Sequence, residues 1–166
     1  MRRLRRATIA VALAVALLLA FTAPALADTS QDVTVTATPT YISISNSPNT
    51  YDFGAVEASG TPNTTTGYFT ITNDSTVNIE VTIVCNGWSG TTSWTYGAPG
   101  ADTGQLKASD GDGAYDVTVD DTTPATLATT SSPGDSISWE LQLDCPTSFS
   151  HGAEQTTTVT IAAAAS

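Results

Sequence analysis

The feature that most constrains the fold is a strict alternation of apolar and polar residues in two segments, 77–85 and 137–145. Successive side chains of a β-strand point to opposite faces of its sheet, whereas a helix repeats its apolar residues with a period of 3.6. Each segment therefore predicts a strand with one buried face. The residues expected to point inward are Val77, Ile79, Val81, Ile83 and Cys85 in the first segment, and Ile137, Trp139, Leu141, Leu143 and Cys145 in the second.

Shorter alternating runs at 115–119, 69–71, 159–161 and 33–35 predict further strands. Clusters of turn-forming residues, mainly Gly, Asn, Asp, Ser and Pro, separate these runs. Threonine occurs 29 times after residue 27, and β-branched residues favour strands over helices. Seven to nine short strands at this spacing predict an all-β fold, an immunoglobulin-like sandwich of two sheets.

The N-terminus has the organisation of a secretory signal peptide. Four arginines within the first six residues precede an apolar run at 7–21, and the small residues Ala25 and Ala27 follow as a cleavage site. An uncleaved membrane anchor is the alternative, but this run is shorter than the roughly 20 residues that a spanning helix needs. We therefore expect residues 1–27 to be removed, leaving residues 28–166 as a single secreted, cell-surface-associated domain.

The charge of the mature chain restricts its partners. After residue 27, Lys107 is the only lysine or arginine, against sixteen Asp and Glu, which gives a net charge of −15. Proteins bind nucleic acid mainly through Lys and Arg that displace counterions from phosphates. The sequence therefore excludes nucleic acid and disfavours an anionic membrane as a partner. High net charge also keeps a secreted protein soluble.

The two cysteines, Cys85 and Cys145, each end an alternating strand at its inward-facing positions. Secreted proteins fold in an oxidising compartment, so we expect a disulfide between them. Closing a loop of about 60 residues would stabilise the fold by roughly 4 kcal/mol in the chain-entropy model. Two buried free thiols are the alternative, and a metal site is disfavoured because two thiols and one histidine make a poor ligand set.

Residues 51–83 carry a resemblance to a known type of module. They contain Asp-Phe-Gly at 52–54, then Val56, a turn with Gly60, the alternating run 69–73 and an apolar strand at 77–83. This order resembles Hydin-like immunoglobulin-type modules of secreted surface proteins. The resemblance implies a binding or scaffolding unit. The general layout is also similar to that of camelysin-type filament subunits.

Two sets of residues are candidate ligand sites. Asp110, Asp112 and Asp116 are spaced with glycines like half of a calcium loop, and a solvated hairpin turn is the alternative. The aromatic residues Trp88, Trp94 and Tyr96 lie in or beside a glycine-rich stretch. Exposed aromatic rings stack on sugars, so these three form a candidate polysaccharide site, with packing beneath a loop as the alternative.

The sequence contains no recognised catalytic motif. Its one histidine, His151, lacks a nucleophile motif, and the adjacent Asp120 and Asp121 point to opposite faces of a strand. We therefore expect a non-enzymatic protein without a cofactor. The run at 33–35 is expected to pair with its own sheet or with the edge of a neighbour. These features predict a structural or adhesive component of a cell surface or extracellular assembly, with a carbohydrate-binding module as the alternative.

Overall fold

The computed structural model describes residues 31–166, which form strands and connecting segments but no helix. The predicted signal peptide lies outside the described residues. Among residues 31–166, no helix has the length and apolar character needed to cross a membrane. The nine strands of the described chain are β1 (Ile44–Ser47), β2 (Phe69–Asn73), β3 (Ile79–Cys85), β4 (Thr95–Tyr96), β5 (Thr103–Ser109), β6 (Val117–Val119), β7 (Ala125–Ser131), β8 (Ser136–Asp144) and β9 (Val159–Ala165).

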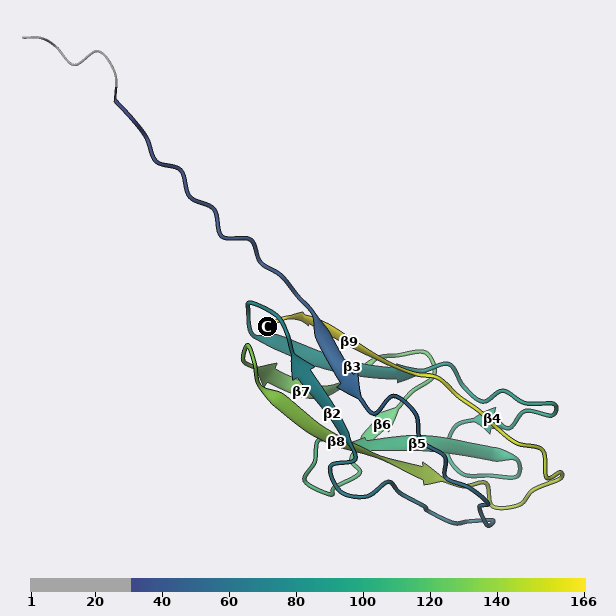
Figure 1. Cartoon of the computed structure of the whole chain (residues 1–166). Coiled ribbons are helices and arrows are strands. Elements are labelled where there is room, and N and C mark those ends of the chain that lie inside the picture. The colour runs from purple at the N-terminus through teal and green to yellow at the C-terminus, as the bar shows by residue number, and fades with distance from the viewer. Residues whose placement is uncertain (1–30) are drawn as a thin grey trace, which may run out of the picture. The chain divides into compact units, whose positions relative to one another are not determined.

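The strands form two sheets, which confirms the predicted all-β sandwich (Figure 1). The larger sheet has the order β1-β2-β8-β5-β4, with β6 also paired to β5. The smaller sheet has the order β7-β3-β9. Except for the parallel pair β4 and β5, neighbouring strands are antiparallel. β1 and β9 are therefore edge strands, one in each sheet.

The core lies between the two sheets and follows the predicted alternation. In β3 every second residue is buried, and Ile79, Val81 and Ile83 are fully covered. In β8 the ring of Trp139 stacks on Phe69 of β2, with ring centroids 4.4 Å apart. The Trp139 indole nitrogen donates a hydrogen bond to Asn46 Oδ1 of β1 at 2.9 Å. This interaction fastens edge strand β1 across β2 to the centre of the larger sheet.

The predicted disulfide between Cys85 and Cys145 is wrong, because both cysteines in the described chain are buried and unbonded. Cys85 ends β3 in the smaller sheet, and its sulfur lies 3.9 Å from the carbonyl oxygen of Val119. Cys145 follows β8 in the larger sheet, where its amide donates to Gly60. The position of each cysteine on the inward-facing side of its alternating strand correctly predicted that both thiols are buried. It did not place them together, since each packs against different neighbours.

The predicted strand at residues 33–35 is absent from the described chain, which has no strand before Ile44. Val33 and Val35 are 83% and 85% exposed. Residues 39–166 form a compact unit that contains all nine described strands, and residues 31–38 lie outside that unit.

Candidate binding groove

The described chain has a groove of about 890 Å³. One wall is the segment 49–56, which follows β1, and the other is the segment 151–161, which leads into β9. Between these walls the groove reaches core residues of the larger sheet: Leu106, Leu141 and Leu143. All three tryptophans of the chain, Trp88, Trp94 and Trp139, also line it. The space between the two sheets is thus accessible from this side.

The first wall is shaped by the Asp-Phe-Gly sequence at 52–54. The Asp52 carboxylate accepts a hydrogen bond from the Gly54 amide at 2.7 Å. Gly54 has a φ of 66°, a left-handed conformation that glycine adopts without steric cost. This local turn leaves Tyr51 packed edge-on against Phe53 and Tyr68, with ring centroids 4.9 and 4.8 Å apart. An aromatic rim therefore follows β1.

The opposite end of the groove is an aromatic stack. Trp94 lies parallel to Phe149, with centroids 5.4 Å apart, and Trp88 packs edge-on against Trp94 at the same distance. The Trp88 indole nitrogen donates to the Gly104 carbonyl at 2.8 Å. The Trp94 indole nitrogen is buried and has no hydrogen-bond partner among the described residues. Two of the three predicted aromatic residues thus line the groove.

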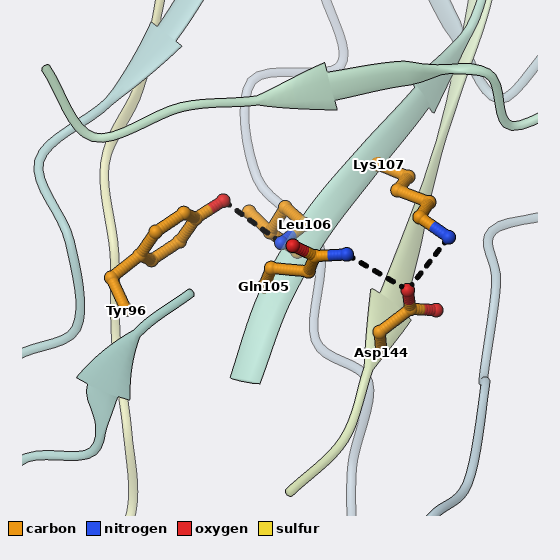
Figure 2. A network of polar contacts seen from close by, with 5 residues as sticks. All are labelled: Tyr96, Gln105, Leu106, Lys107 and Asp144. Carbon is orange, nitrogen blue, oxygen red and sulfur yellow. Dashed lines mark hydrogen bonds and ion pairs between the residues drawn. The ribbon is translucent and has the colours of Figure 1, made fainter. Parts of the chain in front are cut away.

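Tyr96, the third predicted aromatic residue, does not line the groove. Its hydroxyl accepts a hydrogen bond from the Leu106 amide at 2.8 Å (Figure 2). The same hydroxyl donates to the Val119 carbonyl. Burial, together with a hydrogen bond to Cys85, raises the pKa of Tyr96. In the same view Lys107 and Gln105 both contact Asp144, at 2.9 and 3.2 Å. Tyr96 therefore fastens β4 and β6 to β5.

Asp102 holds the loop that carries Phe149. Its carboxylate accepts a hydrogen bond from the Ser150 amide at 2.8 Å, and hydrogen bonding with Ser150 lowers the pKa of Asp102. The neighbouring His151 lines the groove, and its Nδ1 accepts a hydrogen bond from the Ala153 amide at 3.3 Å. The aromatic stack is thus positioned by a carboxylate outside the groove.

The strand that borders the groove, β9, is only partly covered. Among the described strands it pairs with β3 alone, so its other edge carries backbone groups without a strand partner. Its inward residues Val159, Ile161 and Ala163 are half-buried, although their register partners in β3 are fully buried. An edge of this kind is a template for an added strand.

The predicted calcium ligands do not form a cluster. The described chain contains no group of three or more His, Cys, Asp or Glu side chains arranged to hold a metal ion. The Asp112 carboxylate instead accepts hydrogen bonds from the Ser109 hydroxyl at 3.1 Å and the Ala114 amide at 2.7 Å. Asp110 and Asp116 are exposed on either side of this turn. The geometry matches the alternative interpretation, a hairpin turn.

Comparison with protein-family models and with curated proteins finds no match. The resemblance of residues 51–83 to Hydin-like modules, and the weaker one to camelysin-type subunits, therefore stay predictions. The groove itself also escaped prediction from sequence. Its walls come from two segments about 100 residues apart in the chain, 49–56 and 151–161, and the second carries no hydrophobic periodicity before Val159.

Proposed function

We propose that this protein is a secreted, non-enzymatic subunit of an extracellular or cell-surface assembly, and that it binds an extended polypeptide in the groove along β9. One observation carries the proposal: an edge strand with a half-buried apolar face borders a groove that reaches the core. Addition of a strand to such an edge supplies backbone hydrogen bonds, while pockets for alternate side chains supply specificity. The groove thus has the features of a strand-binding site.

The charge of the chain agrees with this role. A protein with a net charge of −15 after residue 27 resists nonspecific association, so contacts between copies need a specific apolar or hydrogen-bonded site. The groove provides apolar side chains from both sheets, including Leu141 and Ile161. Association through this site would combine solubility of the free subunit with stable assembly.

A carbohydrate-binding role is the second candidate, and the tryptophans of the groove favour it. Trp88 is half-buried and Trp94 has an indole nitrogen that is free to donate. However, Trp94 is only 9% exposed and its ring is already stacked on Phe149. Little aromatic face is left for a sugar ring, so we rank this role below strand binding.

The test is the association of the secreted chain, followed by light scattering over a range of concentrations. We expect oligomers that Ile161→Asp abolishes, because a carboxylate would be placed on the inward side of β9. The matched control is Thr160→Asp, which adds the same charge on the exposed side of the same strand. Val159→Asp, which also lies on the inward side and lines the groove, provides a second variant if Ile161→Asp does not fold.

The outcomes separate the two candidates. Association that survives both inward substitutions would exclude the groove as the assembly site. A chain that is monomeric at every concentration, and whose tryptophan fluorescence shifts on titration with soluble oligosaccharides, would replace strand binding with the carbohydrate role. Under our proposal oligosaccharides leave the fluorescence unchanged.

A further inference from the structure

Asn86 is the only asparagine of the chain that directly precedes a glycine. An asparagine can lose its side-chain amide without an enzyme when the main-chain nitrogen of the next residue attacks its side-chain carbonyl carbon, Cγ. Most residues hinder this attack with their own side chain, whereas glycine has no Cβ and lets other groups approach its backbone closely. Asn86 and Gly87 directly follow β3, so the sequence places a reactive dipeptide at the end of a core strand.

The structure leaves both reacting groups free. Asn86 is exposed, and its side chain makes no hydrogen bond within the described chain. The Gly87 amide likewise has no hydrogen-bond acceptor in the part of the chain that the structure describes. By contrast, the Asn73 side chain is fully buried and donates hydrogen bonds to the Val77 and Ser131 carbonyls. Residue type and local structure therefore both single out Asn86.

The reaction at such a dipeptide has two steps and needs only water. In the first step the Gly87 nitrogen forms a bond to Cγ of Asn86, the bond from Cγ to Nδ2 breaks, and ammonia leaves with the proton of the Gly87 amide. In the second step water opens the resulting five-membered imide at one of its two carbonyl groups. Opening at Cγ gives ordinary aspartate. Opening at the main-chain carbonyl gives isoaspartate, in which the backbone runs through the side chain and is one atom longer.

Isoaspartate at residue 86 would lie between two hydrogen bonds that hold a wall of the groove. The Asn86 amide donates to the Thr158 carbonyl at 3.1 Å, and the Ser89 amide donates to the Thr156 carbonyl at 2.8 Å. Thr156 and Thr158 both line the groove, and so does Trp88, which lies between the two donors in sequence. An added main-chain atom in residue 86 therefore puts these two bonds out of register.

Trp88 is the groove residue closest in sequence to this change. Its indole nitrogen donates to the Gly104 carbonyl at 2.8 Å, and its ring packs edge-on against Trp94 with centroids 5.4 Å apart. On the other side of the turn, a Cβ added at Gly87 would lie 3.6 Å from Asp121 Oδ2. Either product adds a carboxylate one residue from this contact, and like charges repel. A longer backbone with an added charge therefore displaces the Trp88 ring.

We propose that Asn86 is a self-modification site: it deamidates spontaneously in the secreted chain, and the isoaspartate that forms moves Trp88 and the groove wall at 156–158. The shape of the groove then depends on the age of each molecule. A newly made chain has the groove described above, and an old chain has an altered one. The inference does not rest on the proposed strand-binding function, because the reaction needs neither a ligand nor a second copy.

The first experiment incubates the secreted chain at physiological temperature and slightly alkaline pH. Peptide mapping by mass spectrometry detects the mass gained at each asparagine when OH replaces NH₂. Asn49 is the internal control, because it is also exposed without a side-chain hydrogen bond in the described chain but precedes the β-branched Thr50. We expect Asn86 to convert at least about tenfold faster than Asn49, since glycine leaves its amide nitrogen unhindered. Equal rates, or no conversion at Asn86, would overturn the inference.

The second experiment tests the consequence for the groove with two variants. Asn86→Gln slows the reaction, because the longer side chain cannot close a five-membered ring, and Asn86→Asp carries the charge of the product without the added main-chain atom. All three tryptophans line the groove, so their fluorescence reports its shape. We expect the emission of the unmodified sequence to shift in step with its isoaspartate content, that of Asn86→Gln to stay constant, and fresh Asn86→Asp to match the fresh chain.

Two results of this experiment would overturn the link to the groove. One is conversion of Asn86 without any change in fluorescence, and the other is an equal drift of fluorescence in Asn86→Gln. Fresh Asn86→Asp that already resembles the aged chain would overturn the longer backbone as the cause. The light-scattering test of the proposed function uses fresh chain, so a failure there and a failure here are distinguishable.

Discussion

β3 and β9 are neighbours in the same sheet, and in both strands alternate residues are more buried than those between them, yet the two strands differ in how well these residues are covered. Ile83 and Ile161 are register partners across this pair. Ile83 is fully buried, because the larger sheet packs over β3, while Ile161 is half-buried at the groove. Alternation therefore indicates that a strand has an apolar face, but does not indicate what covers that face.

Truncation of these two isoleucines should give the largest contrast. Ile83→Ala removes fully buried methyl groups and leaves a cavity, which should cost about 3–4 kcal/mol of unfolding free energy. Ile161→Ala removes the same atoms from a half-covered site and should cost about 1 kcal/mol in a dilute monomer. Urea denaturation followed by tryptophan fluorescence measures both. Equal costs would mean that β9 is as well covered as β3.

The dependence on protein concentration provides a second test of the contrast between Ile83 and Ile161. If a second copy covers β9, Ile161→Ala becomes more destabilising as the concentration of the chain rises, because the associated state gains stability by mass action. The cost of Ile83→Ala should not depend on concentration. A cost of Ile161→Ala that is constant over a hundredfold range of concentration would contradict the proposed assembly.

Two glutamates extend the contrast between covered and open surfaces to polar groups. Glu140 of β8 is 1% exposed and accepts hydrogen bonds from the Gly67 amide at 2.7 Å and the Tyr115 hydroxyl at 3.2 Å. Glu140→Ala leaves both donors unsatisfied and should cost about 3 kcal/mol. Glu80→Ala removes a single bond to Thr126, at the surface, and should cost less than about 0.5 kcal/mol. Thermal melts of the two variants provide the test.

The alternating strands could be predicted from the sequence because their inward-facing residues are large. β5 was not, although it lies in the larger sheet beside β8. Its inward residues include Gly104 and Ala108, and a Cβ added at Gly104 would lie 3.0 Å from the Asp144 carbonyl oxygen. Close approach of the backbones requires glycine there, and glycine carries no hydrophobic signal. The sequence pattern therefore did not predict β4 or β5, and both strands lie within residues 86–113.

The candidate site was predictable only in part. Of the three aromatic residues expected at a polysaccharide site, Trp88 and Trp94 line the groove, whereas Tyr96 has the same glycine-rich surroundings but turns its hydroxyl to the Leu106 amide. Composition near a residue does not determine where its side chain points. The groove depends on the distance between two loops, and no local pattern encodes such a distance.

The reactivity of the two cysteines reports how well the space between the sheets is shielded from solvent on the side away from the groove. Cys85 and Cys145 are 2% and 1% exposed, and burial beside Asp144 raises the pKa of Cys145, so little reactive thiolate forms at pH 8. We expect two free thiols per chain that react with Ellman's reagent only after unfolding. Cys145→Ala should cost about 1 kcal/mol, less than the roughly 4 kcal/mol that a lost disulfide would cost. A mobility difference between reduced and non-reduced chains would contradict this.

The smallest expected effect is confined to the open side and depends on pH. Hydrogen bonding with Ser150 lowers the pKa of Asp102 in the folded state, so its contribution to stability is present above the unfolded pKa of about 4 and is lost as pH falls through the folded value. We expect the loop that carries Phe149 to loosen only below about pH 4, seen as easier acrylamide quenching of the groove tryptophans.

Asp102→Asn keeps an acceptor and tolerates the left-handed φ of 49°, so it should remove this pH dependence without opening the loop. Asp102→Ala should open it at neutral pH. Asp120→Asn is the matched control, because the pKa of Asp120 is also lowered, by Thr122, but its turn does not line the groove. An equal response of both asparagine variants would show that acid acts on the whole fold rather than on the open side.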